Sequence, residues 1–126
     1  MALTKKEVRT IIGVYMQAWV EQDPDLIVTI FTPSAIYHER VLGEPIRTKE
    51  GIRKYWQTKV VESQGKIECD LLNLYLDGDT AIAEWEARFD DRVHGVRKRM
   101  REVAILEFEG RFIASLREYW ASETID

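Results

Sequence analysis

The stretch "RFIASLREYW", residues 111–120, is chemically suggestive because it places a carboxylate in an apolar register. If it is a strand, its side chains alternate between two faces, and Glu118 shares a face with Leu116 and Trp120. Burial disfavours the charged form of a carboxyl group and raises its pKa, so that it can transfer protons near neutral pH. The alternative is a frayed strand end at which Glu118 reaches water. The pattern makes Glu118 a candidate catalytic residue.

A second carboxylate, Glu102, is expected on the neighbouring strand. If the turn between the last two predicted strands pairs Phe108 with Phe112, Glu102 lies opposite Glu118. Two like charges on a half-buried face raise at least one of the two pKa values. In the competing interpretation, one or both carboxylates pair with arginines in a surface lattice, of which the nearby candidates are Arg99, Arg101 and Arg117.

Glu39 and Tyr15 form another candidate pair. Glu39 lies near the end of a predicted strand, and Tyr15 lies on the apolar face of the first predicted helix. A carboxylate near a helix-borne phenol could act as a base beside a hydrogen-bond donor to a carbonyl oxygen. Alternatively, Glu39 is solvated beside Arg40, and the ring of Tyr15 packs in the core.

Aromatic residues are spread along the whole chain, which has four tryptophans and five tyrosines. Such rings commonly fill a core, but they can also line a cavity for a small molecule. The residues expected to line such a cavity, beside the catalytic candidates, are Trp19, Tyr37, Tyr55, Trp56, Trp85, Glu102, Leu116 and Trp120.

Helical periodicity occupies the first half of the chain, and strand-like alternation occupies the second half. Thr4 and Glu7 have the spacing of a capping box, and Asp77-Gly78 has the composition of a hairpin turn. This order predicts a single α+β domain over residues 1–126, with helices on one face of a curved, mostly antiparallel sheet. The expected helices cover 5–21, a short segment from Pro24, and 49–63; the expected strands cover 35–40, 66–76, 79–89, 96–108 and 111–120.

Charge and composition argue against several classes of partner. The net charge of −4 disfavours nucleic acid and anionic membrane surfaces. No apolar run approaches the roughly 18 residues that a membrane span needs. One cysteine and two histidines provide neither a disulfide nor a metal-ligand pattern. We expect a cytoplasmic protein without a metal or cofactor.

The segments "AWVEQDPDLIVTIFTPSAIYHE", "LYLDGDTAIAEWEA" and "EFEGRFIASLREYW" resemble the nuclear transport factor 2-like superfamily, in its SnoaL-like, ketosteroid isomerase-like branch. The resemblance extends from about Val8 to Trp120. It implies a cone-shaped barrel formed by a curved sheet, with three N-terminal helices packed on its concave face and a cavity for a small molecule. It also implies a homodimer formed through the outer face of the sheet.

Comparison with the ketosteroid isomerases assigns roles to individual residues. Tyr15 stands eight residues before Asp23, as does the oxyanion-donating tyrosine of that family, and ungapped extension places Glu39 at the general base. The protonated aspartate of the family falls near Ala104, which cannot replace it. The resemblance also orients Trp120 toward the pocket.

Two functions follow as expectations. One is a cofactor-independent acid–base enzyme of isomerase, cyclase or dehydratase type, acting on an apolar or amphipathic substrate through Glu118, Glu39 and Tyr15. The other is a non-catalytic, dimeric domain that binds a small-molecule ligand or a partner in the same cavity.

Overall fold

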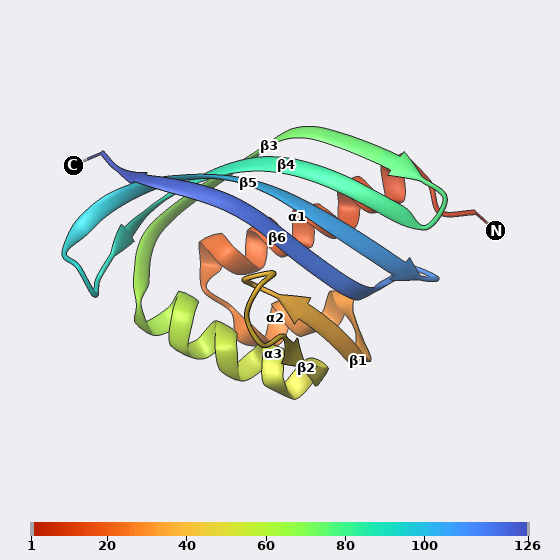
Figure 1. Cartoon of the computed structure of the whole chain (residues 1–126), viewed down its shortest axis with the longest axis horizontal. Coiled ribbons are helices and arrows are strands. Elements are labelled where there is room, and N and C mark those ends of the chain that lie inside the picture. The colour runs from red at the N-terminus through yellow and green to blue at the C-terminus, as the bar shows by residue number, and fades with distance from the viewer. Residues whose placement is uncertain (1, 126) are drawn as a thin grey trace.

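Three helices dominate the first half of the chain in the computed structural model, which describes residues 2–125 (Figure 1). The predicted capping box starts the first helix, because Thr4 and Glu7 each bond the backbone N–H of the other. Asp23 caps the second helix, which continues as a 3₁₀ turn over Val28–Ile30. The helices are α1 (Lys5–Glu21), α2 (Pro24–Ile27) and α3 (Thr48–Trp56).

The third helix differs from the single helix predicted over 49–63. Its α-helical part ends at Trp56, and a wider π turn covers Gln57–Glu62. The Ser63 hydroxyl donates to the Thr58 carbonyl, 2.9 Å away, across this turn. Such π turns are rare and often lie at functional sites, and here the turn carries Lys59 along the cavity described below.

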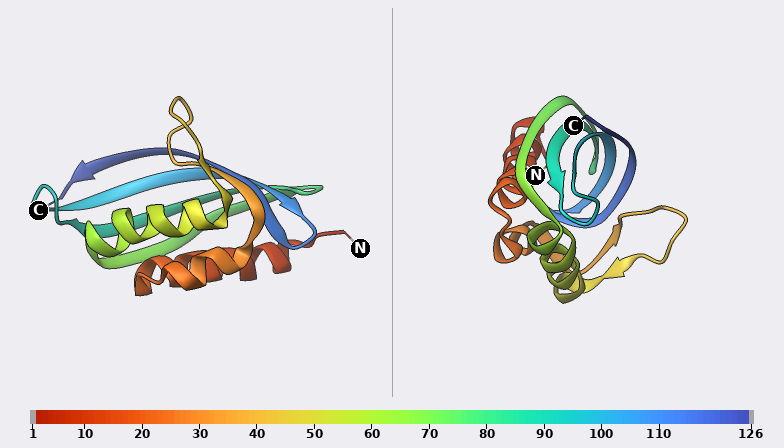
Figure 2. Two further views of the ribbon diagram at one scale, coloured as in Figure 1. Left: turned by 90° about the horizontal axis from the view of Figure 1, so that it is seen from below. Right: turned by 90° about the vertical axis from the view of Figure 1, so that its left-hand side faces the viewer.

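The six strands form one curved sheet in the order β2-β1-β6-β5-β4-β3. Neighbouring strands are antiparallel except for β1 and β6, which run parallel. The sheet curls strongly without closing, and the helices lie along one side of it (Figure 2). The strands are β1 (Phe31–His38), β2 (Ile46–Arg47), β3 (Gln64–Asp77), β4 (Thr80–Asp91), β5 (Val96–Glu109) and β6 (Phe112–Thr124).

This architecture confirms the predicted α+β fold, with differences at the element ends. The two-residue strand β2 was not predicted, and β1 begins at Phe31 rather than at residue 35. Because β1 ends at His38, Glu39 belongs to the loop that projects between β1 and β2 (Figure 2). Strand β6 runs on to Thr124, beyond the predicted end at Trp120.

The core lies between the helices and the concave face of the sheet. Strand β4 alternates as predicted: its inward residues from Ala81 to Phe89 are buried, whereas Ile82 and the charged side chains beyond it face outward. The helices contribute further buried apolar residues, including Val8 and Ile12 of α1 and Ile52 of α3. No helix within residues 2–125 is long and apolar enough to cross a membrane.

The register between β5 and β6 differs from the predicted one. Glu109 pairs with Phe112 across the turn, and an irregularity between Glu107 and Phe108 shifts the register by one further residue. As a result Glu118 lies opposite Ala104, and the predicted pairing of Glu102 with Glu118 is wrong. Since the total shift is two residues, both glutamates still point to the same face, and they lie diagonal to each other.

Candidate active site

The centre of the candidate site is a hydrogen-bonded group of two tyrosines and Glu118. Tyr15 of α1 donates to Oε1 of Glu118 at 2.9 Å, and Tyr37 of β1 donates a short hydrogen bond to the same oxygen. The two phenol oxygens are 2.8 Å apart. Three elements that are far apart in the sequence therefore place polar groups around one carboxylate oxygen inside the core.

Glu102 and Glu118 are both buried, with exposed fractions of 2% and 7%. Glu102 lies on β5 and faces the interior beside Glu118, and its Oε2 has no hydrogen-bond partner within residues 2–125. A buried carboxyl group is costly unless it is protonated or bonded. The two glutamates thus form a pair with unequal hydrogen bonding.

The unequal surroundings indicate which glutamate keeps a proton. Burial raises the pKa of Glu118 to about 7, although hydrogen bonds from Tyr37 and Tyr15 act in the opposite direction. Burial and the nearby charge of Glu118 raise the pKa of Glu102 well above its ordinary value. The pair therefore exchanges a proton near neutral pH, and the hydrogen bonds from the two tyrosines favour Glu118 as the member that carries the charge.

The two phenols remain donors throughout this range. Burial, reinforced by the charge of Glu118, raises the pKa of Tyr15 and of Tyr37 well above the ordinary value for a phenol. A phenol that keeps its proton stabilises the ionised form of Glu118 by donating to it. This explains how a carboxylate can persist in such an apolar position.

The arginines that could have neutralised the pair are engaged on the other side of the sheet. Arg99 pairs with Glu123, Arg101 with Glu86, and Arg117 with Glu107. The predicted surface lattice of charges therefore exists, but it does not include Glu102 or Glu118.

A cavity of about 40 Å³ lies beside this pair. It shares Glu39, Lys59, Gln64 and Met100 with an outer hollow of about 250 Å³, which leads toward solvent. The inner cavity fits the reacting end of a small molecule, and the hollow offers room for the rest of it. Of the residues predicted from the sequence, those that line the inner cavity are Tyr15, Trp19, Tyr37, Glu39, Tyr55, Trp56, Glu102 and Glu118.

Three predicted pocket residues lie elsewhere. Trp85 and Leu116 are fully buried core residues that do not line the inner cavity, although the Trp85 ring centre is 5.0 Å from that of Tyr15. Trp120 is 37% exposed and lines the outer hollow. Its Nε1–H donates to the Glu39 carbonyl at 3.2 Å, and the Arg40 guanidinium lies 5.4 Å from its ring centre.

The expected pairing of Tyr15 with Glu39 also differs in the structure. Tyr15 bonds Glu118 and Tyr37, whereas Glu39 lies at the edge of the cavity and pairs with Arg40 at 3.3 Å. The strand predicted over 35–40 included Glu39, but β1 ends one residue before it. The catalytic roles of these residues remain predictions.

Four cavity residues were missed by sequence reasoning. Met100 could have been found, since it lies two residues before Glu102 on the same face of β5. Lys59 and Val60 reach the cavity from the π turn, which has no recognisable sequence signal. Gln64 accepts a hydrogen bond from Trp19 Nε1 at 2.8 Å, a long-range contact that sequence spacing does not reveal.

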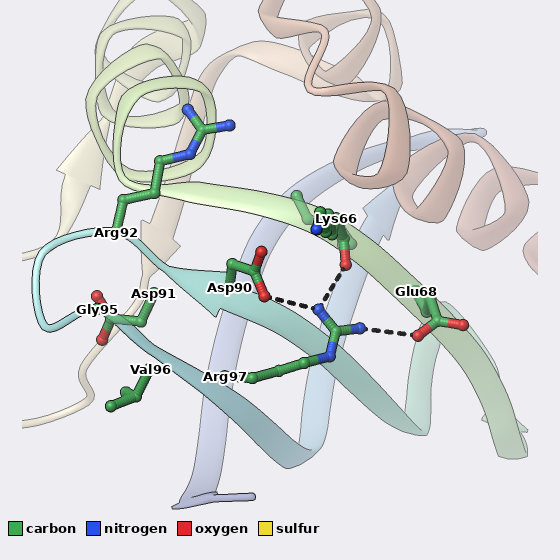
Figure 3. A pocket seen from close by; sticks show the side chains of 9 residues that line it. Lys66, Glu68, Asp90, Asp91, Arg92, Gly95, Val96 and Arg97 are labelled. Carbon is green, nitrogen blue, oxygen red and sulfur yellow. Dashed lines mark hydrogen bonds and ion pairs between the residues drawn. The ribbon is translucent and has the colours of Figure 1, made fainter. Parts of the chain in front are cut away.

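A second, wider hollow of about 1020 Å³ lies between the start of β3 and the turn that joins β4 to β5 (Figure 3). It shares Asp91 with the outer hollow but none of the residues of the inner cavity. Arg97 projects into it and donates to Asp90, Glu68 and the Lys66 carbonyl. Glu68, Asp90 and Arg97 are therefore engaged with one another in a site that is open to solvent. In addition, no three His, Cys, Asp or Glu side chains in the described part of the chain are grouped as metal ligands.

The fold and the buried site together define a protein of the nuclear transport factor 2-like class, with a ketosteroid isomerase-like architecture. The model for the SnoaL-like domain matches residues 13–116. The chain therefore belongs to the SnoaL-like domain family.

Solved structures with this fold include enzymes and a ligand complex. One of them is SalBIII, an epoxide hydrolase/cyclase-like enzyme with a role in pyran ring formation in the polyether salinomycin. Its sequence is 19% identical to this chain, and the match covers 96% of this chain and 97% of SalBIII with a TM-score of 0.81. An LEH-like epoxide hydrolase of M. tuberculosis is 16% identical, with 92% and 84% covered and a TM-score of 0.76.

A hypothetical protein from Catenulispora acidiphila with a ketosteroid isomerase-like fold, solved in complex with trimethylamine, is 18% identical; 86% of this chain and 83% of that chain are covered, with a TM-score of 0.77. At these identities the similarity establishes the shared fold. No curated protein matches the chain.

Proposed function

We propose that this SnoaL-like domain is a cofactor-independent acid–base enzyme of isomerase, cyclase or dehydratase type. The observation that carries the proposal is the buried pair of Glu118 and Glu102, which adjoins a cavity and forms no ion pair with a cationic side chain among residues 2–125. Carboxyl groups whose surroundings push their pKa values apart are typical of acid–base sites. The similarity to epoxide hydrolase/cyclase-like enzymes supports the same reaction class.

In this proposal, Glu118 acts as the base. Its carboxylate removes a proton from a C–H or O–H group of the substrate, and the resulting carboxylic acid returns the proton to another position or to a leaving oxygen. Tyr15 and Tyr37 hold the carboxylate in place and lower the free energy of its charged form. Glu102 stays protonated and therefore neutral, so that no negative charge on Glu102 opposes the ionisation of Glu118.

The aromatic wall indicates an apolar or amphipathic substrate. The rings of Tyr15, Trp19, Tyr37, Tyr55 and Trp56 surround the inner cavity.

A second function is favoured by the same aromatic wall. Aromatic faces beside a carboxylate bind alkylammonium ions, and one protein with this fold was solved with trimethylamine. In that case the domain would bind a small amine without converting it.

The first function can be tested without knowing the natural substrate. 5-Nitrobenzisoxazole opens to a coloured phenolate when a base removes its ring C–H proton, which reports directly on a buried carboxylate. We expect the rate to rise with pH through about 7, where Glu118 loses its proton, and then to level off. A rate no greater than that of free acetate at the same concentration would contradict the proposal.

We also propose a homodimer formed through the outer face of the sheet. Tyr75, Ile82 and Tyr119 are exposed there by 59%, 40% and 46%. Tyr75 pairs with Ile82 and Ile82 with Ile105 across three adjacent strands, which makes a continuous apolar patch. A second copy of this chain would cover the patch on both molecules.

Sedimentation velocity tests the dimer. We expect the wild-type chain to sediment at twice the mass of one chain and Ile82→Glu to sediment as a monomer, because the buried charge would oppose association. Leu42→Glu is the matched control, since Leu42 is 101% exposed and lies in the loop between β1 and β2, away from the patch. A monomeric wild-type chain at high concentration would refute this proposal.

A further inference from the structure

Trp56 provides a buried hydrogen-bond donor in the wall of the inner cavity. Its side chain is 2% exposed, and it lines the cavity. Within the described residues, its Nε1–H has no hydrogen-bond partner. An unpaired buried donor is destabilising, and in a cavity wall a bound molecule can supply the missing acceptor.

Three other aromatic donors on the cavity wall already have partners. Tyr15 and Tyr37 donate to Glu118, and Trp19 donates to Gln64. Tyr55 also lines the cavity, but it is only partly buried, so that water can satisfy its hydroxyl.

The position of the Trp56 ring is fixed from two sides. It is the last residue of α3, at the junction with the π turn. The Tyr15 ring meets it edge-on, with ring centres 5.4 Å apart and an angle of 85° between the planes. Since the hydroxyl of the same Tyr15 bonds Glu118, a single phenol contacts both Trp56 and the carboxylate.

We infer that the indole N–H of Trp56 binds an acceptor oxygen of the ligand, so that the cavity selects molecules with a carbonyl or ether oxygen over hydrocarbons of the same shape. This inference deepens the proposed function, and its chemical consequence rests on that function. An oxygen held by Trp56 would keep an adjacent C–H or O–H group near Glu118, and the N–H would stabilise negative charge that develops on the oxygen during proton removal.

Cyclopentanone and cyclopentane are suitable probes, because they share a ring shape and only the ketone has an acceptor. Indole ¹H–¹⁵N spectra of the wild-type chain report on the donor directly, with the four tryptophan signals assigned from single Trp→Phe variants. We expect the Trp56 indole proton to move downfield with cyclopentanone but not with cyclopentane. A Trp56 signal that responds equally to the two probes, or to neither, would overturn the inference.

The ratio of ketone to hydrocarbon affinity gives a second readout. Trp56→Phe keeps an aromatic ring and removes the N–H, so that the ratio should fall by about tenfold. Trp19→Phe is the control, because Trp19 lines the same cavity but its N–H already donates to Gln64. An equal fall in both variants, or no fall in Trp56→Phe, would contradict the inference.

This experiment does not depend on catalysis. If 5-nitrobenzisoxazole is not converted but the ketone still shifts the Trp56 signal, the acid–base proposal fails and the oxygen-binding site stands. If conversion occurs without ketone selectivity, the oxygen-binding site fails and the acid–base proposal stands.

Discussion

Glu118→Gln is expected to slow the conversion of 5-nitrobenzisoxazole by about 10²–10⁴-fold, which is the usual contribution of a positioned general base. Glutamine has nearly the shape of glutamate, and its carbonyl oxygen can still accept from Tyr15 and Tyr37. The variant therefore removes the titrating group while it keeps the hydrogen bonds that hold the site together. The measurement is the initial rate of phenolate formation at pH 8.

Glu107→Gln is the matched control for this variant. Glu107 lies on the adjacent strand β5, but its side chain is 50% exposed and pairs with Arg117 on the outer side of the sheet. The control should convert the probe at the wild-type rate. Equal rates in wild type, Glu118→Gln and Glu107→Gln would show that the proton acceptor lies elsewhere.

The stability of the wild-type fold is expected to fall as the pH rises from about 5 to 8. In the folded state the pKa of Glu118 is raised from 4.5 to about 7, so that its contribution is complete below the unfolded pKa and is lost as the pH passes through the folded pKa. This difference corresponds to roughly 3 kcal/mol in the free energy of unfolding. Glu102, whose pKa is also raised by burial and by the charge of Glu118, changes stability in the same direction.

Urea unfolding at a series of pH values measures this effect. Glu118→Gln should lose about 3 kcal/mol less than the wild type between pH 5 and 8, because it has no proton to release on unfolding. The partly exposed Asp91 carboxyl does not interfere, since hydrogen bonds from His94 and Lys98 lower its pKa and it titrates below this range. Parallel pH profiles for wild type and variant would mean that Glu118 is hydrated and titrates normally.

Much of the fold could be predicted from local patterns, because those patterns depend on neighbouring residues alone. The capping box at Thr4 and Glu7 fixed the start of α1, and the alternation in β4 identified its buried face. The π turn after Trp56 could not be predicted, since it depends on how the helix end packs rather than on its residue types.

The candidate site was less predictable than the fold. Alternation was sufficient to propose that Glu118 faces inward, because that depends on one strand. The bonds of Tyr15 and Tyr37 to Glu118 join residues 103 and 81 positions apart, and no spacing rule reaches over such distances. The predicted pairing of Glu102 with Glu118 was wrong for a related reason, since the register between β5 and β6 depends on a turn and a bulge.

The irregularity at the start of β6 also determines the chemical character of the cavity wall. Ile113 and Leu116 are both buried although three positions separate them, so that one extra residue is absorbed between them before Glu118 turns inward. A β6 strand with regular alternation from Ile113 would present Arg117 to the interior and Glu118 to solvent. The guanidinium of Arg117 would then stand in the wall in place of the Glu118 carboxylate, beside Glu102 and Glu39. A one-residue insertion or deletion in the backbone of β6 can therefore exchange the charged group that this strand presents to the cavity, with no substitution at the site itself.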